Sequence, residues 1–145
     1  MHVVAFAPSL NAVVDEAGGV NAHGFPMTSC RVESFPAHIT VPLVLAVYTQ
    51  GGTDYDPQQF IVARSPQGET VGVLECRWHW PDNPGAPVKF RVFAHQLPLE
   101  VPSAGVYTIG LYESRHATQT AHSFPLPVLK NNPFATPVSP SSQRM

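Results

Sequence analysis

The chain has few charged side chains, and this shortage removes two classes of protein. Charged residues make up 12% of its 145 residues, whereas soluble domains carry about 25%. The eight basic residues are scattered and the formal net charge is −2, so we expect no binding to nucleic acid, which needs a basic patch. Uninterrupted apolar runs of about 18 residues are also lacking, so we expect no membrane span.

Cysteine is scarce as well. Cys30 and Cys76 are the two cysteines, and a widely spaced pair makes neither a disulfide framework nor a C-x-x-C motif. We therefore expect two free, buried thiols and a reducing, cytoplasmic location. The first eight residues contain no basic side chain, so we expect no signal peptide.

Proline is abundant, with 16 residues spread along the chain. Because proline inside a helix costs about 3 kcal/mol, few windows can hold a helix. Segments rich in β-branched and aromatic residues recur between turn signals, which predicts an all-β fold. The length predicts one domain. We place this domain at residues 1–129, followed by a Pro- and Ser-rich tail at 130–145.

Eight or nine short strands favour a two-layer antiparallel β-sandwich of immunoglobulin-like type. The run 39–49 is apolar on both faces, which predicts a central strand, and Pro42 predicts that this strand begins after it. Residues 11–19 are expected to hold a short helical turn. The other strands are expected at 2–7, 20–24, 27–34, 59–65, 69–80, 88–95, 105–114 and 118–129.

Two local motifs support the sandwich. Ser65-Pro66-Gln67-Gly68 has the residues of a type I turn, so its flanking strands should form a hairpin. Tyr107 follows the turn at 102–105 in the pattern of a tyrosine corner, in which the phenol bonds to backbone across an arch. We assign structural roles to Tyr107, Trp78 and Trp80, with the tryptophans packing across the sandwich.

Several motifs also occur in a familiar order. Phe35-Pro36 precedes the apolar strand, Pro84-Gly85-Ala86-Pro87 forms a loop, and the segment 102–111 reads Pro-Ser-Ala-Gly-Val-Tyr-Thr-Ile-Gly-Leu. Together they resemble a family of uncharacterised small bacterial β-sandwich proteins over residues 2–129. The resemblance implies the fold and supplies no catalytic or binding residue.

Motifs of reaction chemistry are lacking. The seven histidines include no i,i+2 or i,i+4 pair, so their spacing does not indicate a metal site. Nucleophile-elbow, phosphate-loop and His-Glu-x-x-His motifs are absent, and we expect neither an enzyme nor a cofactor. Asp54, Asp56 and Asp82 fall in Pro/Gly loops, where they suit backbone capping or a weak cation site.

These observations favour a non-catalytic interaction or assembly subunit that binds a protein partner or a second copy. Low charge is typical of surfaces that partners cover. Phe93 and Tyr112 are candidate exposed anchors, and Phe134 and Val138 would make the tail a docking arm. Two alternatives stay open: a small-ligand or metal-ion-binding sandwich using the aspartate loops, and a structural component of a virion or other particle.

Overall fold

The structure is a computed structural model that describes residues 1–53 and 55–131. Within these residues the fold is all-β, with ten strands and no helix. It therefore contains no helix there that could cross a membrane. The strands are β1 (His2–Pro8), β2 (Asn11–Val14), β3 (Val20–His23), β4 (Cys30–Val32), β5 (Ala37–Gln50), β6 (Gln58–Arg64), β7 (Thr70–Arg77), β8 (Val88–Val101), β9 (Gly105–Tyr112) and β10 (Ser123–Lys130).

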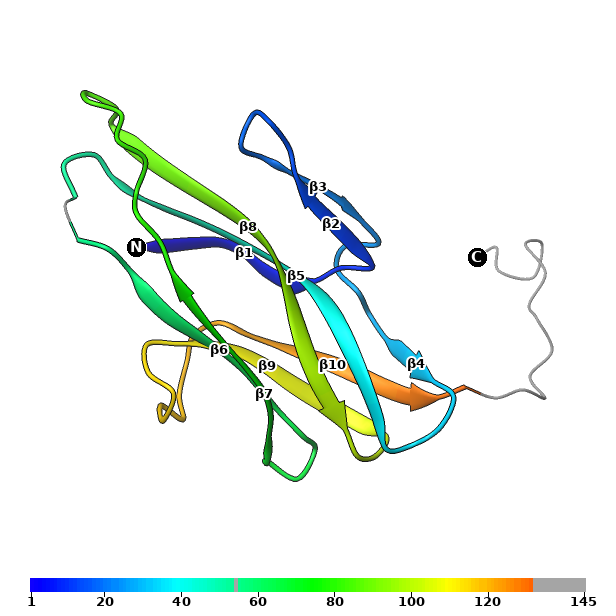
Figure 1. Cartoon of the computed structure of the whole chain (residues 1–145). Helices are drawn as coiled ribbons and strands as arrows, with labels where there is room; N and C mark the ends of the chain where they lie inside the picture. Colours follow the sequence, from blue (N-terminus) through cyan, green and yellow to red (C-terminus); the bar gives the residue numbers. More distant parts are fainter. Residues whose placement is uncertain (54, 132–145) are drawn as a thin grey trace, which may run out of the picture.

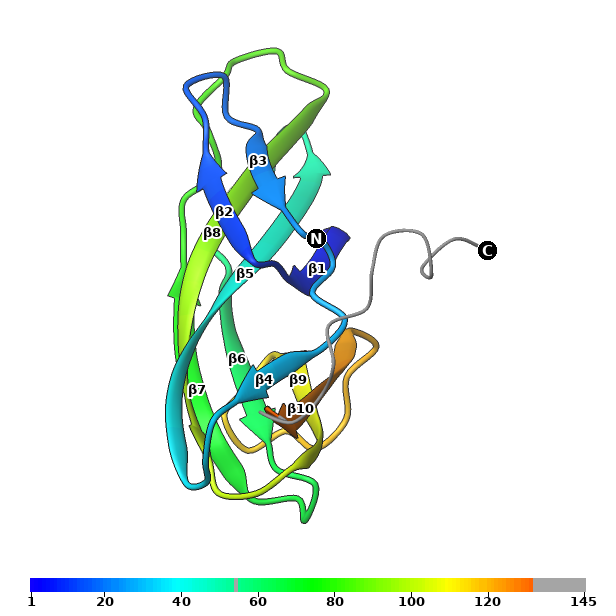
Figure 2. The ribbon, with the colours of Figure 1, turned by 90° about the vertical axis from the view of Figure 1, so that its right-hand side faces the viewer.

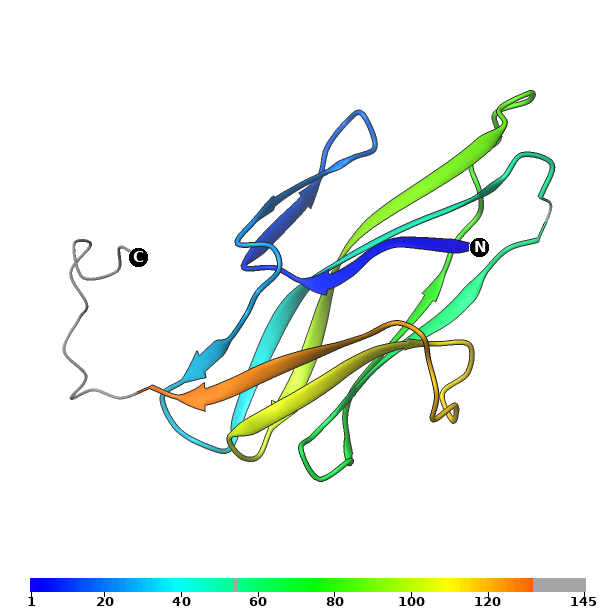
Figure 3. The ribbon, with the colours of Figure 1, turned by 180° about the vertical axis from the view of Figure 1, so that it is seen from behind.

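The strands form two larger sheets and one hairpin (Figure 1). One sheet has the order β1-β5-β8 and the other has the order β4-β10-β9-β6-β7. Pairing is antiparallel except between β4 and β10, which lie side by side in parallel (Figure 3). The predicted central place of the run 39–49 is confirmed, because β5 lies between β1 and β8.

Both larger sheets contribute to a single core. Alternate residues of a strand point to opposite faces, and the odd-numbered residues of β5 face inward with Leu43 and Leu45 fully buried. Ile61 on β6, Tyr107 on β9 and Leu126 on β10 belong to the same buried cluster. The even-numbered residues of β5 consequently lie on the sheet's outer face.

The expected helical turn at residues 11–19 is wrong. β2 and β3 pair as a hairpin instead, with Ala12 opposite Ala22 and Val14 opposite Val20. Asp15 closes the turn with two hydrogen bonds. Its carboxylate accepts a hydrogen bond from Gly19 N at 3.0 Å, and its backbone carbonyl accepts one from Gly18 N at 3.1 Å. The hairpin lies against β5 and β8 on the side away from the five-stranded sheet (Figures 1 and 2).

The expectation that a strand begins after Pro42 is also wrong. β5 runs through Pro42, whose carbonyl accepts from Ser9 N at 2.8 Å on the β1 side. Because the N and O of one residue point to the same side of a strand, the missing N–H faces the point where β1 ends at Pro8. No ladder hydrogen bond is lost there. β8 likewise runs on through Pro98 to Val101.

The predicted hairpin around Ser65–Gly68 is confirmed, because β6 and β7 pair on either side of it. Gly68 N donates to Ser65 O at 2.9 Å, and Ser65 N donates to Glu69 O at 2.8 Å. The last strand starts later than expected, at Ser123, and ends at Lys130.

Candidate functional site

Phe93 is not the exposed anchor that the sequence predicts. Its ring is half-buried and packs against the core, 5.2 Å from the ring centroid of Trp78 and stacked on His95 at 5.2 Å. Arg91 covers it, with the guanidinium carbon 5.1 Å from the ring centroid. Phe93 pairs with Leu45, which is an inward position of β5. The register therefore turns Phe93 toward the core.

Tyr112 is buried too, with 5% of its surface exposed. Arg64 lies 5.0 Å from its ring centroid and donates to its hydroxyl at 2.7 Å. The same guanidinium donates to Ala117 O at 3.3 Å and so ties down the loop after β9. The expected exposure of Tyr112 is wrong because its ring lies against Gly110 and is covered by the guanidinium of Arg64.

The other predicted interaction residues, Phe134 and Val138, lie outside the described residues. Tyr107 is fully buried, and its hydroxyl donates to Ser103 O at 2.6 Å, which is the bond of a tyrosine corner. Trp78 and Trp80 both lie in the core and meet edge to face at 5.8 Å.

The exposed aromatic surface lies elsewhere, on the outer face of the three-stranded sheet. His2, Tyr48 and Phe90 occupy one row across β1, β5 and β8. His2 stacks on Tyr48 at 4.8 Å, and Tyr48 lies 5.5 Å from Phe90, which is 56% exposed. We call these three residues the aromatic triplet.

The surroundings of the aromatic triplet are apolar. The next row on this face is Ala5, Ala46 and Val92, and the row after it is Ala7, Val44 and Ala94. These nine positions hold no acidic side chain, lysine or arginine. Val44 is buried although it faces away from the core, because the β2–β3 hairpin covers this part of the face. The triplet marks the uncovered part.

Sequence reasoning missed the aromatic triplet because its members are separated by 46 and 42 positions in the chain. The register that aligns them depends on pairing between distant strands. One feature of the sequence pointed toward this face. The run 39–49 is apolar on both faces, which indicates that other parts of a protein cover each side of this strand.

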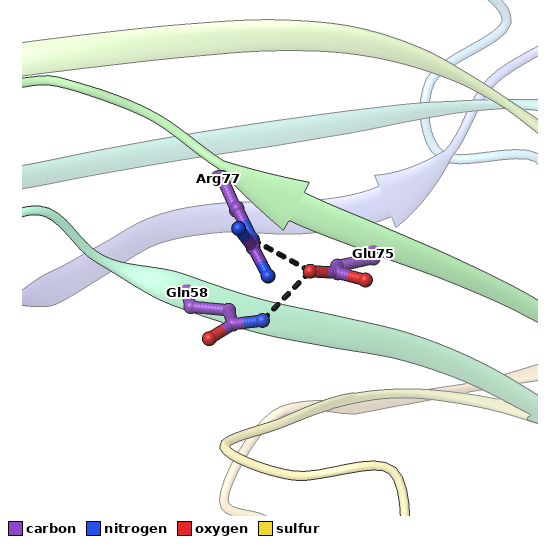
Figure 4. Close-up of polar contacts among 3 residues, drawn as sticks. All are labelled: Gln58, Glu75 and Arg77. Carbon is purple, nitrogen blue, oxygen red and sulfur yellow. Dashed lines mark hydrogen bonds and ion pairs between the residues drawn. The ribbon is translucent and has the colours of Figure 1, made fainter.

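A polar cluster lies where β6 begins and β7 ends (Figure 4). Glu75 Oε1 accepts from Gln58 Nε2 at 2.7 Å and from Arg77 Nε at 2.6 Å. The hydrogen bond from Gln58, followed by that from Arg77, lowers the pKa of the Glu75 carboxyl. Nearby, His79 Nδ1 lies 2.8 Å from Asp56 Oδ2. Asp56, Gln58, Arg77 and His79 border an open hollow of about 430 Å³.

Cys76 and His95 make a contact that resembles a catalytic pair in composition only. The Cys76 sulfur lies 3.5 Å from His95 Nε2. Burial raises the pKa of the Cys76 thiol to about 11, and burial lowers the pKa of His95. A nucleophilic cysteine needs a lowered pKa and access to substrate. Cys76 is 4% exposed, so the pair has the properties of a neutral packing contact.

The aspartate loops do not converge on a cation site in the described part of the chain. Asp56 is occupied by His79, Asp82 is exposed, and Asp54 lies outside that part. Residues 1–53 and 55–131 contain no group of three or more His, Cys, Asp or Glu residues that could hold a metal ion. Both cysteines are unpaired, with Cys30 half-buried and Cys76 buried.

Comparisons with models of protein families, with curated proteins and with solved structures found no match to this chain.

Proposed function

We propose that this protein is a non-catalytic interaction or assembly subunit built on an immunoglobulin-like sandwich. The strand order supports the fold. β1, β5 and β8 would take the places of strands A, B and E in one sheet. β10, β9, β6 and β7 would take those of G, F, C and C′ in the other, with β4 added beside G. Tyr107 supports it further, because a tyrosine corner belongs to strand F.

The observation that carries the function is the uncovered aromatic triplet, whose row and the next two rows of the outer sheet face hold no charged side chain. Aromatic side chains are enriched at protein interfaces, and charged residues are depleted from interface cores. Phe90 and Val4 are each more than half exposed. Such a surface fits a protein partner or a second copy. A role in a virion or other particle would be a special case of this proposal.

The proposed location is a reducing compartment such as the cytoplasm. Its support is that Cys30 and Cys76 are both free.

A small-ligand role is the second candidate, and the hollow beside Asp56 and His79 is the observation that favours it. Its volume of about 430 Å³ lies in the range of ligand pockets. Thermal-shift measurements with millimolar calcium or zinc test the ion-binding form, and an unchanged melting temperature counts against it.

The interaction proposal is tested by affinity capture with matched variants. Wild-type protein and the variants Phe90→Ser and Val106→Ser are each immobilised at full length, and the protein that each one captures is compared. Val106→Ser is the control, because Val106 is exposed on β9, away from the aromatic triplet. We expect Val106→Ser to retain the same bound protein as the wild type and Phe90→Ser to lose at least tenfold, since an aromatic anchor is worth about 2 kcal/mol. Equal retention by all three proteins contradicts the proposal.

A further inference from the structure

Arg64 is the centre of a second polar site, on the outer face of the five-stranded sheet. Ala63 belongs to the core, so by alternation the next side chain along β6, that of Arg64, points outward. The register places Arg64 opposite Thr108 on β9. Thr108 lies between the core residues Tyr107 and Ile109 and is exposed, so its side chain shares this outer face with Arg64.

The guanidinium of Arg64 is held in place by neutral groups. It lies over the ring of Tyr112, which itself rests against Gly110, and it donates to the Tyr112 hydroxyl and to Ala117 O. These two bonds use two of the five N–H donors of a guanidinium. The remaining donors therefore have a fixed position, and fixed donors lose less entropy when they bind a ligand.

The positive charge of Arg64 is not balanced by a neighbouring carboxylate. Arg77 on β7 is paired with Glu75 at 2.6 Å, whereas Arg64 forms no ion pair with an acidic residue in the described part of the chain. Arg64 is nonetheless half-buried. Because a charge that is partly removed from water gains from a partner of opposite charge, the site is suited to an anion.

A hollow beside this guanidinium has room for an anion. Its volume is about 440 Å³, and Arg64 is the one charged residue among the described residues that border it. Ser65, Thr108 and Thr118 border it as well, and each carries a hydroxyl that can donate a hydrogen bond. The lining therefore combines one positive charge with several neutral donors.

The buried hydroxyl of Ser65 is a second, independent observation that points to a ligand. Ser65 is 5% exposed, and its Oγ accepts from Gln67 N at 3.3 Å and from Glu69 N at 3.2 Å. Across residues 1–53 and 55–131, no group accepts the hydrogen of this hydroxyl. A buried donor without an acceptor is unfavourable, and an anion in the hollow can supply the acceptor.

We propose that this hollow binds a phosphoryl group, held by Arg64, Ser65, Thr108 and Thr118. These donors come from two strands, the turn after β6 and the loop after β9. Donors on several sides suit the oxygens of a tetrahedral group better than a planar carboxylate, which one guanidinium edge can bind alone. The hollow has the volume of a small-ligand pocket, so a phosphate ester fits as well as the free ion.

An NMR titration of the full chain with inorganic phosphate, at about pH 7.5 and constant ionic strength, tests this proposal. We expect saturable amide shifts at Ser65, Gly68 and Thr108, with a Kd of about 1 mM. Acetate, a planar anion, should bind roughly tenfold more weakly. Glycerol phosphate distinguishes the two sources of the group, because tighter binding than inorganic phosphate identifies an ester and weaker binding identifies the free ion.

Arg64→Gln and Arg31→Gln are matched variants, since each removes one positive charge and Arg31 is exposed on β4 and does not border the hollow. Arg64→Gln should weaken phosphate binding by about tenfold or more, while Arg31→Gln should leave the Kd unchanged. Thr108→Val keeps the contacts of Arg64 with Tyr112 and Ala117 and should weaken binding roughly threefold to tenfold.

Three results would overturn the phosphoryl site. They are shifts that do not saturate up to about 30 mM phosphate, equal affinities of Arg64→Gln and Arg31→Gln, and acetate binding as tight as that of phosphate. If Arg64→Gln does not fold, Thr108→Val decides, and an unchanged Kd in that variant counts against the site. The site lies on the other sheet from the aromatic triplet, so its failure leaves the proposed function untouched.

Discussion

Tyr107 links the arch before β9 to the core through one atom. Its hydroxyl donates to Ser103 O and accepts from Ser103 N at 3.4 Å, while its ring is fully buried. The arch therefore has both backbone groups of one residue satisfied by a side chain four positions away. Losing this hydroxyl leaves these two half-buried backbone groups without their partner.

We expect Tyr107→Phe to lower the free energy of unfolding by about 1–2 kcal/mol, because the ring still fills its site while the half-buried backbone groups of Ser103 lose their partner. Urea denaturation measures the change. Tyr55→Phe is the control, since Tyr55 is 49% exposed, and it should change stability by less than about 0.5 kcal/mol. Equal effects of the two substitutions would contradict this role of Tyr107.

Cys76 should make the free energy of unfolding fall as the pH rises in the alkaline range. Its thiol has a pKa of about 11 in the folded protein, compared with 9.0 as the ordinary value. Between these values the unfolded chain loses a proton that the folded chain keeps, so the free energy of unfolding falls as pH rises. We expect a loss of roughly 1–2 kcal/mol from pH 9 to 11 through this group.

Denaturation of wild type and Cys76→Ala across this pH range measures the contribution of Cys76. The variant starts less stable because it leaves a cavity, but its stability should fall less steeply with pH. Parallel curves for the two proteins would show that burial does not hold this thiol in its neutral form.

At the scale of elements, local signals predicted more than distant pairings did. The Ser65–Gly68 turn located the β6–β7 hairpin because its residues set the turn by themselves. Residues 11–19 were predicted as a helical turn because β2 acquires its pairing only through β3. The start of β5 was predicted wrongly from Pro42. The missing N–H of a proline interrupts a sheet only where a neighbouring strand would accept from it, and β1 ends at that point.

The approach of β7 to β8 requires glycine at one position. A Cβ on Gly72 would lie 2.6 Å from Pro98 O and 3.0 Å from Leu99 Cδ2. We expect Gly72→Ala to lower the free energy of unfolding by about 2–4 kcal/mol, because the two strands must separate to admit the methyl group.

Gly19→Ala is the matched control for this substitution. Its nearest neighbour would be a carboxylate oxygen of Asp15 at 3.6 Å, an ordinary contact. Its effect should stay within about 0.5 kcal/mol in the same chemical denaturation experiment. If Gly72→Ala proves equally mild, β7 and β8 do not pack as closely as described.

For the whole molecule, the class of fold could be predicted and the candidate site could not. Alternation showed that Phe90 and Phe93 lie on opposite faces of one strand, but the apolar face is that of Phe90, since Phe93 shares its face with Lys89 and Arg91. Which of them turns inward is decided by the other sheet, where Trp78 packs against Phe93. Tyr112 was misassigned for a similar reason, since Arg64, which bonds to its hydroxyl, is distant in sequence.

The exposed aromatic face is the central claim, and hydroxyl-radical footprinting of the full chain tests it most directly. In dilute protein, Phe90 and Tyr55 should be oxidised rapidly, and Phe93 and Tyr112 slowly. In the assembly that affinity capture isolates, Phe90 should become protected while Tyr55 stays reactive. Rapid oxidation of Phe93 and Tyr112 in dilute protein, or an unprotected Phe90 in the assembly, would contradict the account.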